Sequence, residues 1–357
     1  MDGSGWSWLL GDTLQKPNMR HLKGKTVIVT GAGGSIGSEI VRKLEDSLAK
    51  TIVLVDSAEH ALYQVVRSLK NPKSPRVAPL IADIRHPAAL DAVWAKYPPD
   101  CVLHAAALKH VPMLETGHNF IEAVRTNLTG THNVLEATKK HARAGKIPKA
   151  IIISTDKAVN PSSTMGLTKR LGELMAHTHN GAQVSVTVVR FGNVFGSSGS
   201  AVPLFKEQIK NGGPITITDT RMTRYMMTIS NAVYLVLQST AFTRSNLCVL
   251  DMGDPIKIVD LAKVLARLNG REPGLDIDMT VIGIRPGEKL HEELFTDGEK
   301  ELIRETRGMF ELTVNPPDQK QYLLLHTLMT EADNRNVSKA EETALKLVPE
   351  FTGKVGI

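Results

Sequence analysis

The first two-thirds of the chain alternates short apolar, β-branched runs with longer amphipathic stretches. Strands are predicted at 26–30, 51–55, 77–81, 101–104, 150–154 and 184–190. The clearest helices span 120–141 and 163–177, and a later apolar run at 248–250 is expected to rejoin the sheet. Near-continuous apolar strands separated by amphipathic helices are typical of a parallel sheet covered on both faces. The pattern therefore predicts an α/β fold with a doubly wound parallel sheet.

This alternation weakens after Arg190, which predicts a second, smaller unit. Residues 191–226 are rich in Gly, Ser and Thr, and residues 273–330 mix turns with short strands. Loop-rich segments carried by a sheet domain commonly form a lid or a substrate-binding unit. We expect a leader at 1–22 and a main domain at 23–195, rejoined by about 226–272. The smaller C-terminal substrate domain is expected from 196–225 and 273–357.

Composition narrows the class of protein. The chain has 357 residues, 42% of them hydrophobic, and a formal charge of +6, which favours a folded globular protein over a disordered one. Cys101 and Cys248 lie in apolar runs, so we expect a reducing, cytoplasmic location. Partner proteins could hold the chain at the inner face of the membrane. No apolar stretch reaches the roughly 18 residues of a membrane span, and the N-terminus does not resemble a signal peptide.

Two other classes of site are not expected. The densest basic stretch, 70–76, lacks interleaved aromatic residues, so we expect no nucleic-acid binding. His104 and His110 have no third ligand at metal spacing, so we expect no metal, and we interpret His104 as a hydrogen-bonded residue at a strand end.

A glycine-rich turn follows the first predicted strand. Gly31, Gly34 and Gly37 form G-x-x-G-x-x-G before a helix, and Asp56 ends the second strand. Such glycines allow a tight turn whose helix N-terminus meets a pyrophosphate, and the carboxylate accepts hydrogen bonds from an adenosine ribose. The pattern predicts NAD, because a 2′-phosphate would be repelled by Asp56; a tight turn without a ligand is the alternative. The remaining residues of the expected cofactor turn and strand ends are Ser35, Ile36, Asp83, Ile84, Ala105 and Ala106, although Asp83 could instead be a plain strand-end cap.

A second motif follows the fifth predicted strand. The strand ends in Ser-Thr-Asp-Lys at 154–157, and the next helix carries Met165 and Lys169. Residues four apart lie on the same helical face. Asp156 and Lys157 are adjacent titratable groups at the carboxyl end of a strand, which favours acid–base chemistry over an exposed charged turn.

These motifs resemble the extended short-chain dehydrogenase/reductase superfamily, whose helix carries Tyr-x-x-x-Lys. STDKA, ALKHVPMLE, RFGNVFGSSGS, RMTRYMMTI and RPGEKLHEEL together resemble UDP-N-acetylglucosamine 4,6-dehydratases of polysaccharide biosynthesis. They are most similar to the subgroup, often part of larger membrane-anchored proteins, in which methionine, here Met165, replaces the tyrosine. The resemblance covers about residues 9–310 and leaves open whether the chain is naturally short or a catalytic fragment.

The resemblance implies a redox-neutral dehydration. The C4 hydroxyl is oxidised by NAD, water leaves from C5–C6, and the hydride returns to C6, on a route to sugars such as those of lipopolysaccharide O-antigen. It assigns Lys157 to the C5 proton, protonated Asp156 to O6, and Thr155 to the C4 oxygen. Lys169 would hold the nicotinamide ribose, while Met165 shapes the pocket. The implied UDP contacts are Lys109, Asn193, Arg224, Arg285 and Glu288, any of which could instead be a surface ion pair.

Two other functions remain open. A nucleotide-sugar 4-epimerase shares the C4 oxidation but needs no acid at O6, and an inactive dinucleotide sensor would explain the lost tyrosine. Sequence leaves the C5 configuration open, with the methionine subgroup leaning towards retention. Relatives commonly pair through helices equivalent to 120–141 and 163–180, so a homodimer or larger homo-oligomer is expected.

Overall fold

The computed structural model describes residues 18–71, 76–197, 199–242, 246–306 and 308–355. Most of the expected leader, residues 1–17, and part of the basic stretch at 70–76 lie outside these ranges. Residues 20–22 form the short helix η2 (Arg20–Leu22), which buries Leu22 against the main core.

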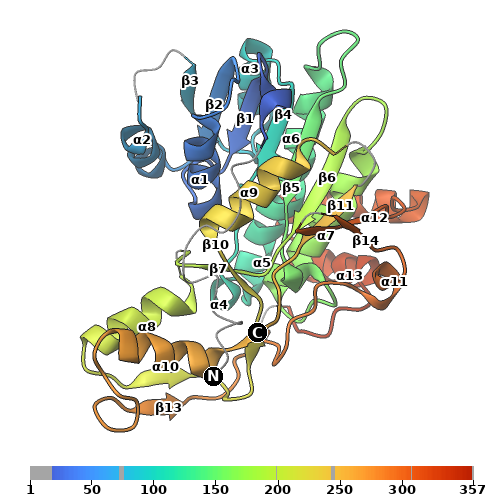
Figure 1. The fold of residues 1–357 in the computed structure, drawn as a ribbon. Helices are drawn as coiled ribbons and strands as arrows, with labels where there is room; N and C mark the ends of the chain where they lie inside the picture. Colours follow the sequence, from blue (N-terminus) through green and yellow to red (C-terminus); the bar gives the residue numbers. More distant parts are fainter. Residues whose placement is uncertain (1–17, 72–75, 198, 243–245, 307, 356–357) are drawn as a thin grey trace.

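Within these ranges nine strands form one sheet, in the order β14-β15-β11-β6-β5-β4-β1-β2-β3 (Figure 1). β1 to β6 and β11 pair in parallel, whereas β15 and β14 add antiparallel strands at one edge. Their bounds are β1 Thr26–Thr30, β2 Thr51–Asp56, β3 Val77–Ile81, β4 Cys101–His104, β5 Lys149–Ile153, β6 Ser185–Arg190, β11 Leu247–Leu250, β14 Arg304–Thr306 and β15 Met309–Leu312. The doubly wound α/β prediction is confirmed.

Strand residues alternate between two apolar layers. Val27 and Val29 of β1 face the core beneath α1 (Ser35–Leu44), α2 (Glu59–Ser68) and α9 (Ile229–Ser239). Ile28 faces the opposite core beneath α3 (Pro87–Lys96) and α6 (Gly130–Lys140). Because both faces are covered, each strand is apolar at successive positions.

The strand order reverses beside β1, which pairs with β2 on one side and with β4 on the other. In open α/β sheets a ligand crevice forms outside the carboxyl ends of the strands at such a point. The glycine turn after β1 and the segment after β4 therefore meet there.

The long helix expected at 120–141 consists of α5 (Gly117–Ala123), the π-helical segment η3 (Val124–Thr129) and α6. Asn127, inside η3, exchanges hydrogen bonds of 2.8 and 3.0 Å with the backbone of Leu108. It also donates to Thr168 on α7 (Thr164–His179). The wider turn thus lets one side chain hold the segment after β4 against α7.

A smaller lobe lies below the sheet in Figure 1. It packs α8 (Ala201–Lys210) and α10 (Ile258–Leu268) over the parallel pair β8 (Ile215–Ile217) and β13 (Met279–Val281). α10 was expected in the main domain, but its apolar face packs on α8. The remaining elements are α4 Val111–Leu114, η4 Asp156–Ala158, β7 Asn193–Phe195, β9 Thr223–Arg224, β10 Met226–Thr228, β12 Ile256–Lys257 and α11 Asp297–Lys300.

The C-terminal segment differs from the sequence expectation. Residues 304–357 were assigned to the smaller domain, yet β14 and β15 extend the main sheet, and α12 (Gln319–Asp333) and α13 (Val337–Leu347) pack on its helices. Leu325 and Leu328 of α12 share one buried cluster with Leu171 of α7 and Leu128 of η3. Part of the helical face expected to form a dimer is therefore covered by the chain's own C-terminal helices.

No helix in the ranges that the structure describes is long and apolar enough to cross a membrane.

Candidate active site

A cleft of about 820 Å³ opens between the carboxyl ends of the strands and the smaller lobe. Most of the expected site residues line it, namely Gly34, Ser35, Ile36, Gly37, Ala105, Lys109, Thr155, Lys157, Met165, Lys169, Asn193, Arg224, Arg285 and Glu288. Six expected residues do not line it: Gly31, Asp56, Asp83, Ile84, Ala106 and Asp156. Segments far apart in sequence thus converge as the motifs predicted.

The glycine turn begins at Gly31, whose φ is +66°. A Cβ there would lie 2.5 Å from the backbone nitrogen of Ala106, so only glycine allows this close approach of the β1 and β4 loops. Gly34 is the N-cap of α1, whose first turn carries no acidic residue. A pyrophosphate fits such a turn because the helix N-terminus presents backbone N–H groups and a positive dipole.

Asp56 stabilises this turn from the end of β2. Its carboxylate accepts hydrogen bonds of 2.8 Å from the Gly33 N–H and 2.9 Å from the Ala58 N–H. The negative charge therefore sits beside the turn, as the NAD prediction requires.

Asp83 forms a forked ion pair with Arg85, which also contacts Glu122 at 2.8 Å. Burial alone would raise the pKa of Asp83, but the neighbouring guanidinium lowers it. Beyond Asp83, Ile84 is buried and packs over Gly130. The adenine contacts expected of Asp83 and Ile84 stay predictions.

The loop after β5 forms the densest polar cluster of the cleft. Lys157 Nζ donates to Asp156 Oδ1 at 3.1 Å and to Asn193 Oδ1 at 2.9 Å, and Thr155 Oγ1 donates to Asp156 Oδ1 at 2.8 Å. Asp156 is fully buried, and its Oδ2 has no hydrogen-bond partner among the described residues. Asp156 was expected to contact substrate directly; in this conformation it reaches the cleft only through Thr155 and Lys157.

Glu292 is a residue that the sequence analysis missed. Its buried carboxylate lines the cleft and lies 3.7 Å from both Lys157 Nζ and Arg224 Nε. Burial alone would lower the pKa of Lys157, but the carboxylates of Asp156 and Glu292 raise it. Glu292 belongs to the RPGEKLHEEL motif, but nothing local distinguished it from Glu293, which is exposed.

Met165 and Lys169 lie on α7 opposite this loop. Gly166 allows the contact, since a Cβ there would overlap the Lys157 carbonyl oxygen. Lys169 Nζ donates to the Ile153 carbonyl at 2.6 Å, and burial lowers the pKa of Lys169 to about 8. Met165 is 4% exposed and packs with Leu114. The thioether therefore occupies the tyrosine position as an apolar wall.

A buried ionic network supports the strand ends. Arg190 donates two hydrogen bonds of 2.7 Å to Glu173 and one of 2.7 Å to Glu299, and Ser154 donates to Glu173 at 2.6 Å. Burial alone would raise the pKa of Glu173, but Arg190 lowers it to about 2. The network was not predicted because its residues come from four separate segments, the end of β5, α7, β6 and α11.

The expected UDP contacts differ in their surroundings. Arg224 donates to the carbonyls of Thr223, Lys289 and Leu290, so it holds the 289–290 segment as well as facing the cleft. Glu288 accepts from the Arg285 backbone N–H at 3.2 Å. Burial lowers the pKa of Lys109. Their roles towards a substrate stay predictions.

The expectation for His104 is confirmed. Its ring nitrogens lie 2.7 Å from Thr30 Oγ1 and 3.1 Å from Thr131 Oγ1, and burial lowers its pKa to about 3. It is a neutral, hydrogen-bonded core residue.

Known proteins are similar to this chain in sequence and in fold. The chain is 47% identical over 285 residues to the capsular polysaccharide biosynthesis protein CapD of Staphylococcus aureus, covering 78% of this chain and 46% of that protein. The Bacillus subtilis protein EpsC is covered to the same extent, so the chain spans about half the length of these curated relatives.

Other relatives are covered over most of their length. A UDP-N-acetylglucosamine 4,6-dehydratase (inverting) of Campylobacter jejuni is 33% identical, with 81% of this chain and 83% of that protein covered. A UDP-glucose 4-epimerase of Rickettsia felis is 34% identical, with 82% and 84% covered. The X-ray structure of Pen from Bacillus thuringiensis superposes with a TM-score of 0.73 at 32% identity, covering 82% of this chain and 90% of that one.

These relatives confirm the resemblance derived from the motifs. A family model described as "Polysaccharide biosynthesis protein" matches residues 27–313, most of the main domain and the smaller lobe. The chain belongs to this family of polysaccharide biosynthesis proteins.

Proposed function

We propose that this chain dehydrates UDP-N-acetylglucosamine to a UDP-4-keto-6-deoxy-N-acetylhexosamine with NAD as its cofactor. The observation that carries the proposal is the Asp156–Lys157 pair, joined at 3.1 Å beside the cleft. Both the relative named as a UDP-N-acetylglucosamine 4,6-dehydratase and the shared motifs support this substrate.

NAD suits the glycine turn, the Asp56 carboxylate and Lys169. When bound it would accept the hydride from C4 and return it to C6. Lys169, positively charged at neutral pH with a pKa of about 8, would favour loss of the C4 hydroxyl proton. Met165 has no titratable proton, so a water held by Thr155 would accept that proton.

The elimination needs a base at C5 and an acid at O6. With Lys157 protonated and Asp156 ionised, one proton transfer along their hydrogen bond produces a neutral amine and a carboxylic acid together. Lys157 then takes the C5 proton, and the Asp156 proton goes to the departing O6 through the Thr155 hydroxyl, which contacts Asp156 at 2.8 Å. After water leaves, the pair is again an ammonium and a carboxylate. When the hydride returns to C6, the Lys157 ammonium would give a proton to C5 and recover one from solvent, which replaces the proton lost from the C4 hydroxyl, so the protons balance.

The experiment is incubation of the full chain with UDP-N-acetylglucosamine and NAD in deuterated water, followed by mass spectrometry and NMR of the sugar. The expected product has lost one water, carries a C4 ketone, and holds solvent deuterium at C5, whose configuration the same spectra assign. Lys157→Ala should abolish the product but leave substrate and NAD binding intact. Lys320→Ala, an exposed lysine on α12 away from the cleft, is the control.

A 4-epimerase is the second candidate, favoured by the relative named UDP-glucose 4-epimerase. It would yield a product of unchanged mass without deuterium at C5, because epimerisation at C4 breaks no bond at C5. Binding of NAD and sugar without any product would instead indicate an inactive sensor, and either result would overturn the dehydratase proposal.

A further inference from the structure

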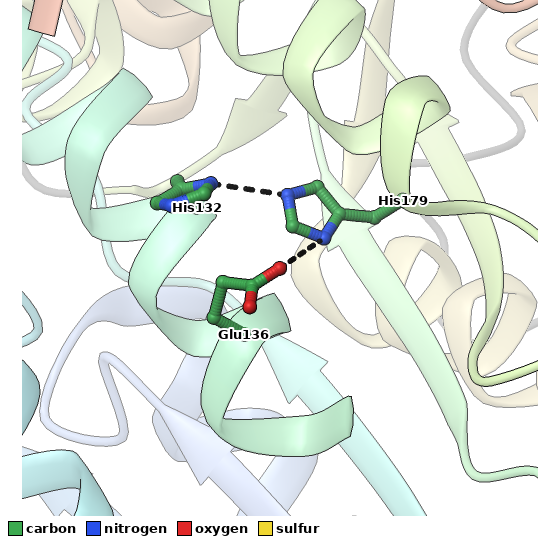
Figure 2. Close-up of side chains that lie close together, drawn as sticks. All are labelled: His132, Glu136 and His179. Atoms are coloured by element: carbon green, nitrogen blue, oxygen red, sulfur yellow. Dashed lines mark hydrogen bonds and ion pairs between the residues drawn. The ribbon is translucent and has the colours of Figure 1, made fainter. Parts of the chain in front are cut away.

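A histidine-rich cluster lies outside the cleft, between α6 and the end of α7 (Figure 2). His132 and Glu136 are four residues apart on α6 and therefore share one face of that helix. His179 is the last residue of α7. Histidines close together in the sequence, such as His104 and His110, give no sign of this cluster, because it is assembled from two separate helices.

The spacing of these side chains suits a shared cation. His132 Nδ1 lies 3.1 Å from His179 Nε2, and His179 Nδ1 lies 3.4 Å from Glu136 Oε1. One ligand atom from each of the three residues can be chosen so that all lie within 4.8 Å of one another. Two nitrogens on one tetrahedral zinc ion, each about 2.0–2.1 Å from the metal, are about 3.3 Å apart. The His132 Nδ1–His179 Nε2 pair is thus already near coordination spacing, whereas Glu136 Oε1 faces the other nitrogen of the His179 ring and would have to turn to reach the same ion.

Hydrogen bonds within the protein do not fully satisfy this cluster. His179 is 5% exposed, and its Nδ1 makes no hydrogen bond among the described residues, although its ion-pair partner Glu136 Oε1 lies 3.4 Å away. A buried polar atom without a partner is costly and uncommon.

The C-terminal helices meet the same cluster. The ring of His326, on α12, stands perpendicular to that of His132 with 5.1 Å between centroids. His326 Nε2 is also buried without a hydrogen-bond partner in the described part of the chain. A change in the position of the His132 ring would therefore also affect the packing of α12.

We propose that His132, Glu136 and His179 bind a divalent transition-metal ion of the zinc class. Two imidazoles and one carboxylate favour zinc and its first-row neighbours, whereas calcium and magnesium prefer all-oxygen sites. The half-exposed Glu136 carboxylate leaves the site open to solvent for entry and for a water ligand. The ion would join α6 to the end of α7 and, through the His132–His326 contact, stabilise the packing of α12. This proposal revises the expectation that the chain holds no metal, and it is independent of the proposed dehydratase activity.

The test is a zinc titration of the metal-stripped full chain by calorimetry, with cobalt(II) as a spectroscopic probe of coordination. One equivalent of zinc should bind, and His132→Gln and His179→Gln should each weaken it by about 100-fold or more, beyond the roughly 10–100-fold typical of an outer-shell partner. His60→Gln, an exposed histidine on α2, is the matched control and should bind like the wild type. Calcium and magnesium should not compete.

A second readout keeps the test valid if His179→Gln fails to fold. His132 is only partly buried, so His132→Gln should retain the fold. Zinc should raise the Tm of the wild type and of His60→Gln but not that of His132→Gln. Equal zinc affinity in His132→Gln and the wild type would overturn the proposal, as would a Tm that zinc raises equally in both.

Discussion

Glu292→Gln tests the electrostatics of the cleft because it removes one charge and keeps the shape of the side chain. Glu292 Oε1 lies 3.7 Å from Lys157 Nζ. Two unit charges at this distance interact by about 4 kcal/mol at an effective dielectric constant of about 20. This is an upper limit, because Arg224 Nε lies 3.7 Å from the same oxygen and offsets part of the field.

The substitution should lower the pKa of Lys157. Glu292 is one of the two carboxylates that hold this pKa above its ordinary value of 10.5. One pKa unit corresponds to about 1.4 kcal/mol, so loss of an interaction of this size should lower the pKa of Lys157 measurably. The neutral amine, the form that can accept the C5 proton, then becomes populated at lower pH. Arg224 should stay in place because three backbone carbonyls hold it.

The assay is the pH dependence of Lys157 acylation by an amine-selective reagent, measured by mass spectrometry of the peptide. The acylation profile of Glu292→Gln should move to lower pH. At a fixed pH below the Lys157 pKa, this variant should also exchange deuterium at C5 of the keto product faster than the wild type. Glu293→Gln is the control, since this neighbouring glutamate is half exposed and pairs with Lys289. Coinciding profiles for Glu292→Gln and the wild type would show that Glu292 does not control the protonation of Lys157.

Three further predictions concern the cofactor turn, the tyrosine position and the supporting network. Met165→Leu should retain measurable single-turnover activity, whereas Thr155→Val should lose about 10²–10⁴-fold in activity because it removes a proton-transfer group. A larger loss in Met165→Leu than in Thr155→Val would refute the proposal that a water held by Thr155 accepts the C4 hydroxyl proton. Protein stripped of its cofactor should bind NAD more tightly than NADP in calorimetry, because the Asp56 carboxylate would repel the 2′-phosphate of NADP. Tighter binding of NADP would contradict this prediction. Glu173→Gln should lower the free energy of unfolding by about 3–5 kcal/mol near neutral pH, because it leaves the buried Arg190 short of one carboxylate. Since the folded pKa of Glu173 is about 2 and its ordinary value is 4.5, its contribution is present above the ordinary value and is lost as the pH falls from 4.5 towards 2. The difference between the two urea midpoints should therefore shrink in acid, and a constant difference would count against the network.

Sequence alone determined the features that are local in the chain. The strand at 26–30 has the bounds that the apolar pattern predicts, and a glycine turn and a helix follow it as Gly31, Gly34 and Gly37 predict, because turn geometry depends on neighbouring residues. Thr155, Lys157, Met165 and Lys169 line one cleft because strand ends in a doubly wound sheet converge at one edge.

Tertiary structure decided the contacts between segments distant in sequence. Burial of Glu292 beside Lys157 depends on how the irregular segment after β13 crosses the cleft, and Glu293 has the same local chemistry but is exposed. Asp156 is fully buried and does not line the cleft itself, which its motif does not encode. Likewise α12 and α13 pack on the main domain because their apolar stripes find a complementary buried face there, which brings His326 to His132. Periodicity reports which face of an element is apolar, whereas only the folded chain decides what covers that face.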